Sequence, residues 1–221
     1  CPNSGNAAGS RSQVMVGNAI YDAAEKLVQA LRKQDGTFRN YNELKAEDIP
    51  AYHLGVYCSA PYCEATNEEA GQGNPFIAYM YAVFLSEVEV NTLTGKTEVK
   101  RMVAAYDVGK IGNRLVVEGQ AYGGLAQGIG MALSEDFEDL KAHNTLAKSG
   151  LPYINDVPDD LELHFLETPR LHSAFGSSGI GEVVTTSPHA SIINAIDDAC
   201  GVRIRSLPAY PHKVLAALQN K

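Results

Sequence analysis

Two adjacent runs of high β-propensity constrain the fold of this chain more than any other feature. Residues 76–90 and 96–107 are rich in β-branched and aromatic side chains, and the Thr-Gly pair within Asn91–Gly95 is typical of a tight turn. We therefore predict an antiparallel hairpin. Its water-facing side chains are expected to be Glu87, Glu89, Lys96, Glu98 and Lys100.

Further helices and strands are predicted on both sides of this hairpin. Helical spacing of apolar residues covers 12–34, 115–134, 187–200 and 211–218, with a charged helical continuation over 134–148 and a short helix within 35–50. Short strands are predicted at 53–59, 161–166 and 202–207. This order indicates an α+β fold, with helices packed on mixed or antiparallel sheets. The expected division is into two lobes, 1–110 and 111–221.

Composition limits the classes of function. The chain has 221 residues, 45% of them hydrophobic, and a formal net charge of -8, which is typical of a globular protein and unfavourable for binding nucleic acid. Apolar runs are too short to span a membrane. Four cysteines do not make a disulfide framework at this length, so reduced thiols and a cytoplasmic location are expected. Because Cys1 stands where a methionine would, we expect a piece of a longer protein.

One carboxylate lies in a glycine-rich loop. Within Phe175–Glu182, glycines allow positive φ and close approach of the backbone, and Ser187-Pro188 is typical of a helix start. Glu182 is thus a candidate general base, provided that burial raises its pKa toward neutral pH. The alternative, a solvated glutamate on a surface loop, is equally compatible with this stretch alone.

A second candidate site precedes the first helix. Residues 3–13 form a loop of small hydrogen-bonding residues at a predicted helix N-terminus, which suits a phosphate group, and Arg11 adds a guanidinium. The sequence has neither a Walker lysine nor a GxGxxG pattern at this point. An ordinary capped helix start is the alternative.

The third candidate is the predicted helix 115–134, which contains five glycines although each one costs about 1 kcal/mol relative to alanine. Such a helix fits close packing against a flat cofactor or another backbone. Gln120 and Gln127 lie two turns apart on one face and offer donors and acceptors. A close helix contact with two surface glutamines is the alternative. His189 is interpreted as a capping or core residue, and no His/Cys spacing predicts a metal ligated by protein side chains.

Three blocks, in this order and spacing, resemble the C-terminal part of the molybdenum-binding subunit of the xanthine oxidase family, and the bacterial aldehyde oxidoreductases most of all. They are Pro2–Gln13, Glu118–Gly130 and Phe175–Glu182. The likeness continues through 187–196 and 207–215. The resemblance implies catalytic roles for Glu182, the active-site glutamate, and Gln120, which hydrogen-bonds at the molybdenum centre. The cofactor-binding residues that it implies are Ala8, Gly9, Ser10, Arg11, Ser12, Gln13, Gln120 and Gly181.

The resemblance also implies a cofactor and a reaction. The cofactor would be molybdenum–molybdopterin cytosine dinucleotide, on which the three loops converge. The enzyme would oxidise a small aldehyde to a carboxylic acid with water as oxygen source, and electrons would leave through [2Fe–2S] clusters. Those clusters and the first molybdenum-binding domain would lie outside this chain, so it should be inactive alone, and the complete enzyme is expected to be a homo-oligomer.

Val183-Val184 stand where the purine hydroxylases have Pro-Pro, which favours the aldehyde branch. Two alternatives stay open. One is a purine or N-heterocycle hydroxylase of the xanthine dehydrogenase type, and the other is a non-catalytic module that binds a nucleotide or cofactor.

Overall fold

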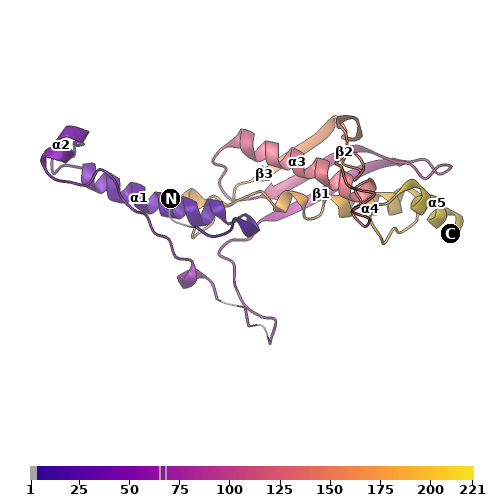
Figure 1. The fold of residues 1–221 in the computed structure, drawn as a ribbon, viewed down its shortest axis with the longest axis horizontal. Helices are drawn as coiled ribbons and strands as arrows, with labels where there is room; N and C mark the ends of the chain where they lie inside the picture. Colours follow the sequence, from indigo (N-terminus) through magenta and orange to yellow (C-terminus); the bar gives the residue numbers. More distant parts are fainter. Residues whose placement is uncertain (1–3, 65, 68) are drawn as a thin grey trace. The chain divides into compact units, whose positions relative to one another are not determined.

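The computed structural model describes residues 4–64, 66, 67 and 69–221, so the first residues of the Pro2–Gln13 block lie outside the description. The chain forms two compact units, Cys1–Tyr79 with Thr168–Gly179, and Met80–Glu167 with Ile180–Lys221 (Figure 1). This division differs from the lobes predicted at 1–110 and 111–221. The reason is that the hairpin pairs with a strand and packs on helices that follow it in sequence, whereas 168–179 packs on the first helix.

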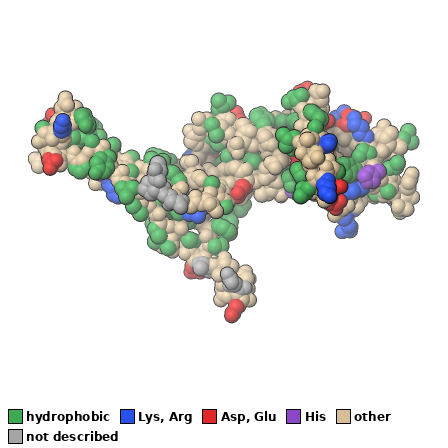
Figure 2. All heavy atoms as spheres, in the orientation of Figure 1, with side chains coloured by type: hydrophobic (Ala, Val, Ile, Leu, Met, Phe, Trp, Pro, Cys, Tyr) green, Lys and Arg blue, Asp and Glu red, His purple; other side chains and the backbone are tan. Residues whose placement is uncertain are grey.

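The first unit is built on a long helix, α1 (Ser12–Leu31), preceded by the 3₁₀ turn η1 (Ala8–Ser10). Its other elements are α2 (Tyr41–Ala46), η2 (Ala60–Tyr62) and η4 (Ala174–Gly176). The predicted first helix and the short helix after it are confirmed. Val14 is the buried residue of α1. Hydrophobic side chains elsewhere on this helix reach the surface (Figure 2).

The predicted strand over 53–59 is wrong. This segment is extended, but its backbone lies against α1 instead of another strand. The Val56 N–H donates to Asp22 Oδ2 over 2.8 Å, and the Leu54 carbonyl accepts from Lys26 Nζ over 3.1 Å. At Gly55 an added Cβ would lie 2.8 Å from the Ala19 carbonyl carbon, so a glycine permits this close approach.

The second unit contains a mixed sheet of order β1-β2-β3. Strands β1 (Tyr81–Val90) and β2 (Thr97–Asp107) form the predicted antiparallel hairpin, with Asn91–Gly95 at its turn, and β3 (Asp160–Leu166) lies parallel to β2. The five charged residues predicted on the wet face of the hairpin are exposed. Residues 202–207 lie outside the sheet, and the strand predicted there is wrong because Val202 and Ile204 bury their side chains in the core without joining a ladder.

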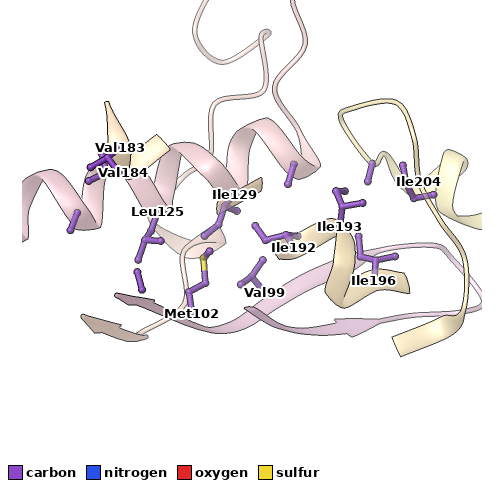
Figure 3. Packing of buried hydrophobic residues seen from close by; sticks show 14 of the residues in the cluster. Val99, Met102, Leu125, Ile129, Val183, Val184, Ile192, Ile193, Ile196 and Ile204 are labelled. Atoms are coloured by element: carbon purple, nitrogen blue, oxygen red, sulfur yellow. The ribbon is translucent and has the colours of Figure 1, made fainter. Parts of the chain in front are cut away.

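Helices α3 (Arg114–Leu133) and α4 (Pro188–Cys200) pack over one face of this sheet, and a buried apolar cluster joins them to it (Figure 3). The fully buried residues include Tyr106, Met102, Leu125, Ile129, Ile192 and Ile196. Three elements complete the unit, namely η3 (Ile154–Asp156), η5 (Val183–Thr185) and α5 (Pro211–Gln219). As predicted, Pro188 begins α4, and Gly201 follows it with a φ of 66°.

The helical continuation predicted over 134–148 is wrong. The chain leaves helical geometry at Ser134, with a φ of -144°. Asp136 and Asp139 then accept hydrogen bonds from the N–H groups of Glu138 and Lys141, and such aspartate turns compete with helical hydrogen bonds. The mixed arrangement confirms the predicted α+β class. Among the described helices, none has the length and apolar character that a membrane crossing requires.

Candidate functional site

The first unit contains the predicted anion-binding loop. Gly9 and Ser10 have left-handed backbones, with φ of 67° and 55°, and α1 begins two residues later at Ser12. Arg11 occupies the N-cap position without a capping side-chain hydrogen bond, and the residues around it are exposed apart from the half-buried Ser10. Because the first N–H groups of a helix have no partner within the helix, this exposed end can receive an anionic group.

A second predicted loop packs on this one within the same unit. Gln13 Nε2 donates to Ser177 Oγ over 3.2 Å, across 164 residues of sequence. An added Cβ at Gly179 would lie 2.8 Å from Ser10 Cβ and would overlap the Ser10 carbonyl oxygen. Ser177 and Ser178 are buried. The structure thus joins the 8–13 loop to the first half of the glycine-rich stretch, and glycine at position 179 is what lets the two backbones approach.

Phe175 was missed as a residue of interest. It has a φ of 54°, which is rare for a bulky residue, and its side chain is 82% exposed. Tyr21 of α1 contacts its ring edge-on, with 5.4 Å between ring centroids. The following residue, Gly176, also has a positive φ. This glycine is the feature of the sequence that could have indicated an unusual turn here.

Glu182 lies in the second unit, directly before η5. Its carbonyl accepts from the Thr185 N–H and from Thr185 Oγ1, both over 3.0 Å, while Ile180, Val183 and Val184 are buried around it. The backbone of Glu182 is therefore anchored on both sides. Its side chain is exposed in this chain, so the apolar pocket that would make it a base is not formed by the described residues alone.

Gln120 lies on α3, in the same unit, and is exposed. The helix that carries it contacts η5 closely, because an added Cβ at Gly124 would lie 2.7 Å from the Val184 carbonyl oxygen. One turn further on, a Cβ at Gly128 would lie 2.6 Å from Pro188 Cβ. The contact between α3 and η5 thus fixes the Glu182 segment to the helix of Gln120.

The glycines of α3 fall into two groups, and the first confirms the predicted close packing. Gly124, Gly128 and Gly130 serve close packing inside the unit. Gly119 and Gly123 have nothing within 4 Å of an added Cβ, and they flank Gln120 on the exposed side of the helix. This second group leaves a flat surface beside Gln120 to which a planar group can come close.

The large pKa shifts in this chain belong to groups other than these candidate site residues. Lys96 and Lys100 hydrogen-bond to Glu98 and lower the pKa of this exposed carboxyl to about 2. Burial raises the pKa of the Tyr106 hydroxyl in the core.

In the described part of the chain, no three His, Cys, Asp or Glu side chains gather in a way that could hold a metal ion. His189 lies in the first turn of α4, and its buried Nδ1 has no hydrogen-bond partner among the described residues.

The chain matches a family of cofactor-binding domains. It belongs to the molybdopterin cofactor-binding domain family, whose model matches residues 1–158. Its relatives place it in the xanthine oxidase family of molybdenum enzymes, which confirms the resemblance of the three sequence blocks.

Similar proteins include aldehyde oxidoreductases and a nicotine 6-hydroxylase subunit. The aldehyde oxidoreductase of Megalodesulfovibrio gigas is 52% identical over 220 residues, which is 99% of this chain and 24% of that protein. The solved structure of the aldehyde oxidoreductase from Desulfovibrio gigas matches with a TM-score of 0.96 and 51% identity, over 99% of this chain and 24% of that chain. The nicotine 6-hydroxylase large subunit of Paenarthrobacter nicotinovorans is 38% identical over 60% of this chain and 17% of its own length. The chain therefore spans about a quarter or less of these relatives.

Proposed function

We propose that this chain supplies Glu182 as the general base, and Gln120 beside it, to a molybdenum enzyme that oxidises aldehydes to carboxylic acids. The observation that carries the proposal is the 52% identity, over 99% of the chain, to an aldehyde oxidoreductase. The contact of η5 with α3 supports it, because this contact holds the segments of Glu182 and Gln120 together. Convergence of these residues with the 8–13 loop on one cofactor remains a prediction.

The residues present fit a molybdopterin dinucleotide. In the first unit, the left-handed Gly9-Ser10 pair, the exposed start of α1 and the Arg11 guanidinium would bind its phosphates. In the second unit, the open positions at Gly119 and Gly123 would leave room for the cofactor beside the Gln120 amide. Gly181 is exposed and would leave space next to Glu182. We propose the cytosine dinucleotide form of the cofactor.

When bound, the molybdenum would supply Lewis acidity and accept two electrons. The Glu182 carboxylate would take the proton of the water that provides the new oxygen atom, which makes that oxygen a stronger nucleophile toward the aldehyde carbon. The Gln120 amide would donate a hydrogen bond as negative charge builds on oxygen in the transition state. The buried Val183 and Val184 would hold the Glu182 backbone in place during this step.

The remainder of the enzyme would complete this chemistry. We propose that it contributes the first molybdenum-binding domain, [2Fe–2S] clusters that carry the electrons away, and the rest of the substrate channel. The complete enzyme would form a homo-oligomer, and the chain alone would be inactive. The free thiols of Cys58, Cys63 and Cys200 favour a cytoplasmic location.

A second candidate function is hydroxylation of an N-heterocycle. The similarity to the nicotine 6-hydroxylase subunit favours it, although that similarity is lower and covers less of the chain. A Val-Val pair after Glu182, in place of Pro-Pro, favours the aldehyde substrate.

The test uses the complete native enzyme. Molybdenum and released cytidine nucleotide are measured per mole of enzyme, and initial rates are compared on short aldehydes, purines and N-heterocycles with an artificial electron acceptor. We expect near-stoichiometric metal and nucleotide and the highest kcat/KM on aldehydes. A preference for a heterocycle would overturn the substrate assignment, and nucleotide without metal or turnover would favour a non-catalytic binding module.

A further inference from the structure

The sheet of the second unit has two unlike faces. Alternate residues of β1 point toward α3 and α4, and the remaining ones form what we call the outer sheet face. Its residues are Tyr81, Val83, Leu85 and Glu87 of β1, Arg101, Val103, Ala105 and Asp107 of β2, and Asp160, Glu162, His164 and Leu166 of β3. In an antiparallel hairpin whose second face meets water, such positions are usually polar.

One half of the outer sheet face is largely apolar and accessible along β1. Tyr81, Val83 and Leu85 are 62%, 63% and 63% exposed. Leu166 of β3 is 56% exposed, and Asp107 of β2 lies between it and Tyr81 in the strand register. The strand register places Val83 opposite Ala105 and Leu85 opposite Val103, so the apolar side chains are continuous across β1 and β2. A continuous exposed apolar patch of this kind marks a surface that another protein segment covers.

The other half of the outer sheet face is acidic. Arg101 pairs with Glu87 over 3.3 Å, with Asp160 over 3.2 Å and with Glu162 over 2.5 Å. His164 Nε2 lies 2.7 Å from Glu162 Oε1. Three carboxylates around a single guanidinium leave an excess of negative charge beside the apolar patch, which a partner can neutralise with lysine or arginine side chains.

The length of a relative indicates what could cover this face. The aldehyde oxidoreductase of Megalodesulfovibrio gigas is much longer than this chain, which matches 24% of it.

We infer that the outer sheet face is an internal interface, covered by a segment of the remainder of the same enzyme that presents apolar side chains to Val83 and Leu85 and a cation to Glu87 or Glu162. The inference rests on the proposed function only in that both assign the chain to a larger enzyme. It names a surface that takes no part in the proposed chemistry, because α3 lies on the opposite face of the sheet (Figure 3).

Hydroxyl-radical footprinting of the complete wild-type enzyme tests this inference without a mutation. Oxidation is quantified by mass spectrometry at Tyr81 and Leu85, with Leu93 as control because it lies in the turn of the same hairpin and is 87% exposed. We expect oxidation rates at least tenfold lower at Tyr81 and Leu85 than at Leu93 after correction for intrinsic reactivity. Comparable corrected rates at the three positions would overturn the inference.

The same measurement at decreasing enzyme concentration identifies the covering molecule. If Tyr81 and Leu85 stay protected from oxidation in the isolated protomer, the covering segment belongs to the remainder of the enzyme, as inferred. Protection that disappears as oligomers dissociate would show a second copy instead and would overturn the inference.

Cross-linking gives a second test. A photo-reactive phenylalanine analogue at position 85 should give cross-linked peptides from outside residues 1–221, and the same analogue at position 93 should not. Because neither readout depends on turnover, an inactive enzyme with a protected face would contradict the proposed function and leave this inference standing.

Discussion

Gly124 of α3 lies directly against Val184 of η5, so closely that a Cβ at position 124 would stand 2.7 Å from the Val184 carbonyl oxygen. Gly124 is one turn after Gln120, and Val184 is two residues after Glu182. A glycine that costs the helix stability therefore holds the two proposed catalytic side chains on neighbouring elements.

Replacing this glycine should loosen that contact. Gly124→Ala gains about 1 kcal/mol of helix propensity but must displace η5, and overpacking of this kind costs about 1–3 kcal/mol. We expect a lower thermal midpoint of the complete enzyme and faster amide exchange over 182–186.

Gly112→Ala is the control, because an added Cβ there has nothing within 4 Å in this chain and the position lies outside the proposed cofactor surface. Its exchange over 182–186 should equal that of the wild type. Slower or unchanged exchange in Gly124→Ala would contradict the packing role of Gly124.

A second close approach should control cofactor binding. Gly179→Ala would push the backbone of 177–179 away from Ser10 and strain the hydrogen bond between Gln13 and Ser177. We expect the cofactor content of the purified complete enzyme, measured as released nucleotide, to fall by at least half. Gly112→Ala, where an added Cβ meets nothing within 4 Å, should keep full content. Full nucleotide content in Gly179→Ala would contradict a role of these loops in binding.

Glu135 gives a prediction about pH. Burial raises the pKa of this carboxyl, and its Oε1 is buried without a hydrogen-bond partner among the described residues. A raised folded-state pKa means that the folded state binds more protons than the unfolded state, so the destabilisation is absent below the unfolded pKa of about 4.3 and develops as pH rises above it. Glu135→Gln should therefore raise the thermal midpoint at pH 7–8, with the difference vanishing near pH 4. The exposed Glu138→Gln should shift the midpoint little at either pH, and an equal effect of both variants would refute this account.

The two glutamines of α3 should differ in function although they share a helix face. If the Gln120 amide donates to charge that develops in the transition state, Gln120→Ala should lower kcat by about 10²–10³ with molybdenum content unchanged. Gln127→Ala, two turns away on the same face, should retain most of the turnover. Similar rates for the two variants would show that Gln120 has no special role.

The elements predicted correctly from sequence carry local signals. The hairpin has β-branched runs around a Thr-Gly turn, and α4 has Pro188 at its start and Gly201 at its end. These signals act within a few residues, so they do not depend on the rest of the fold. The strands predicted at 53–59 and 202–207 depend on the rest of the fold, because a strand forms only where another strand pairs with it. One of these segments lies on α1 and the other fills the core.

The contacts around the candidate site could be predicted only in part, because they too join segments that are distant in sequence. Glycines and a lone carboxylate marked the 175–182 loop, but the contact of Gly179 with Ser10 spans most of the sequence. The helix predicted over 134–148 failed because Asp136 and Asp139 form local turns that apolar spacing does not reveal. The exposure of Glu182 likewise could not be judged from its neighbours in sequence, because burial depends on segments that are distant in sequence, and Glu182 is exposed in this chain.

The most direct test of the central claim is the turnover of the Glu182→Gln variant of the complete enzyme on an aldehyde, with molybdenum measured in the same sample. Glu118→Gln is the control, because Glu118 lies in the helix of Gln120 and only pairs with Arg114 over 2.6 Å among the contacts described for it. We predict a loss of at least 10³-fold in kcat for Glu182→Gln at wild-type molybdenum content, in line with the removal of a general base, and near-normal turnover for the control. Near-normal turnover of Glu182→Gln with molybdenum bound would contradict the claim that Glu182 is the base.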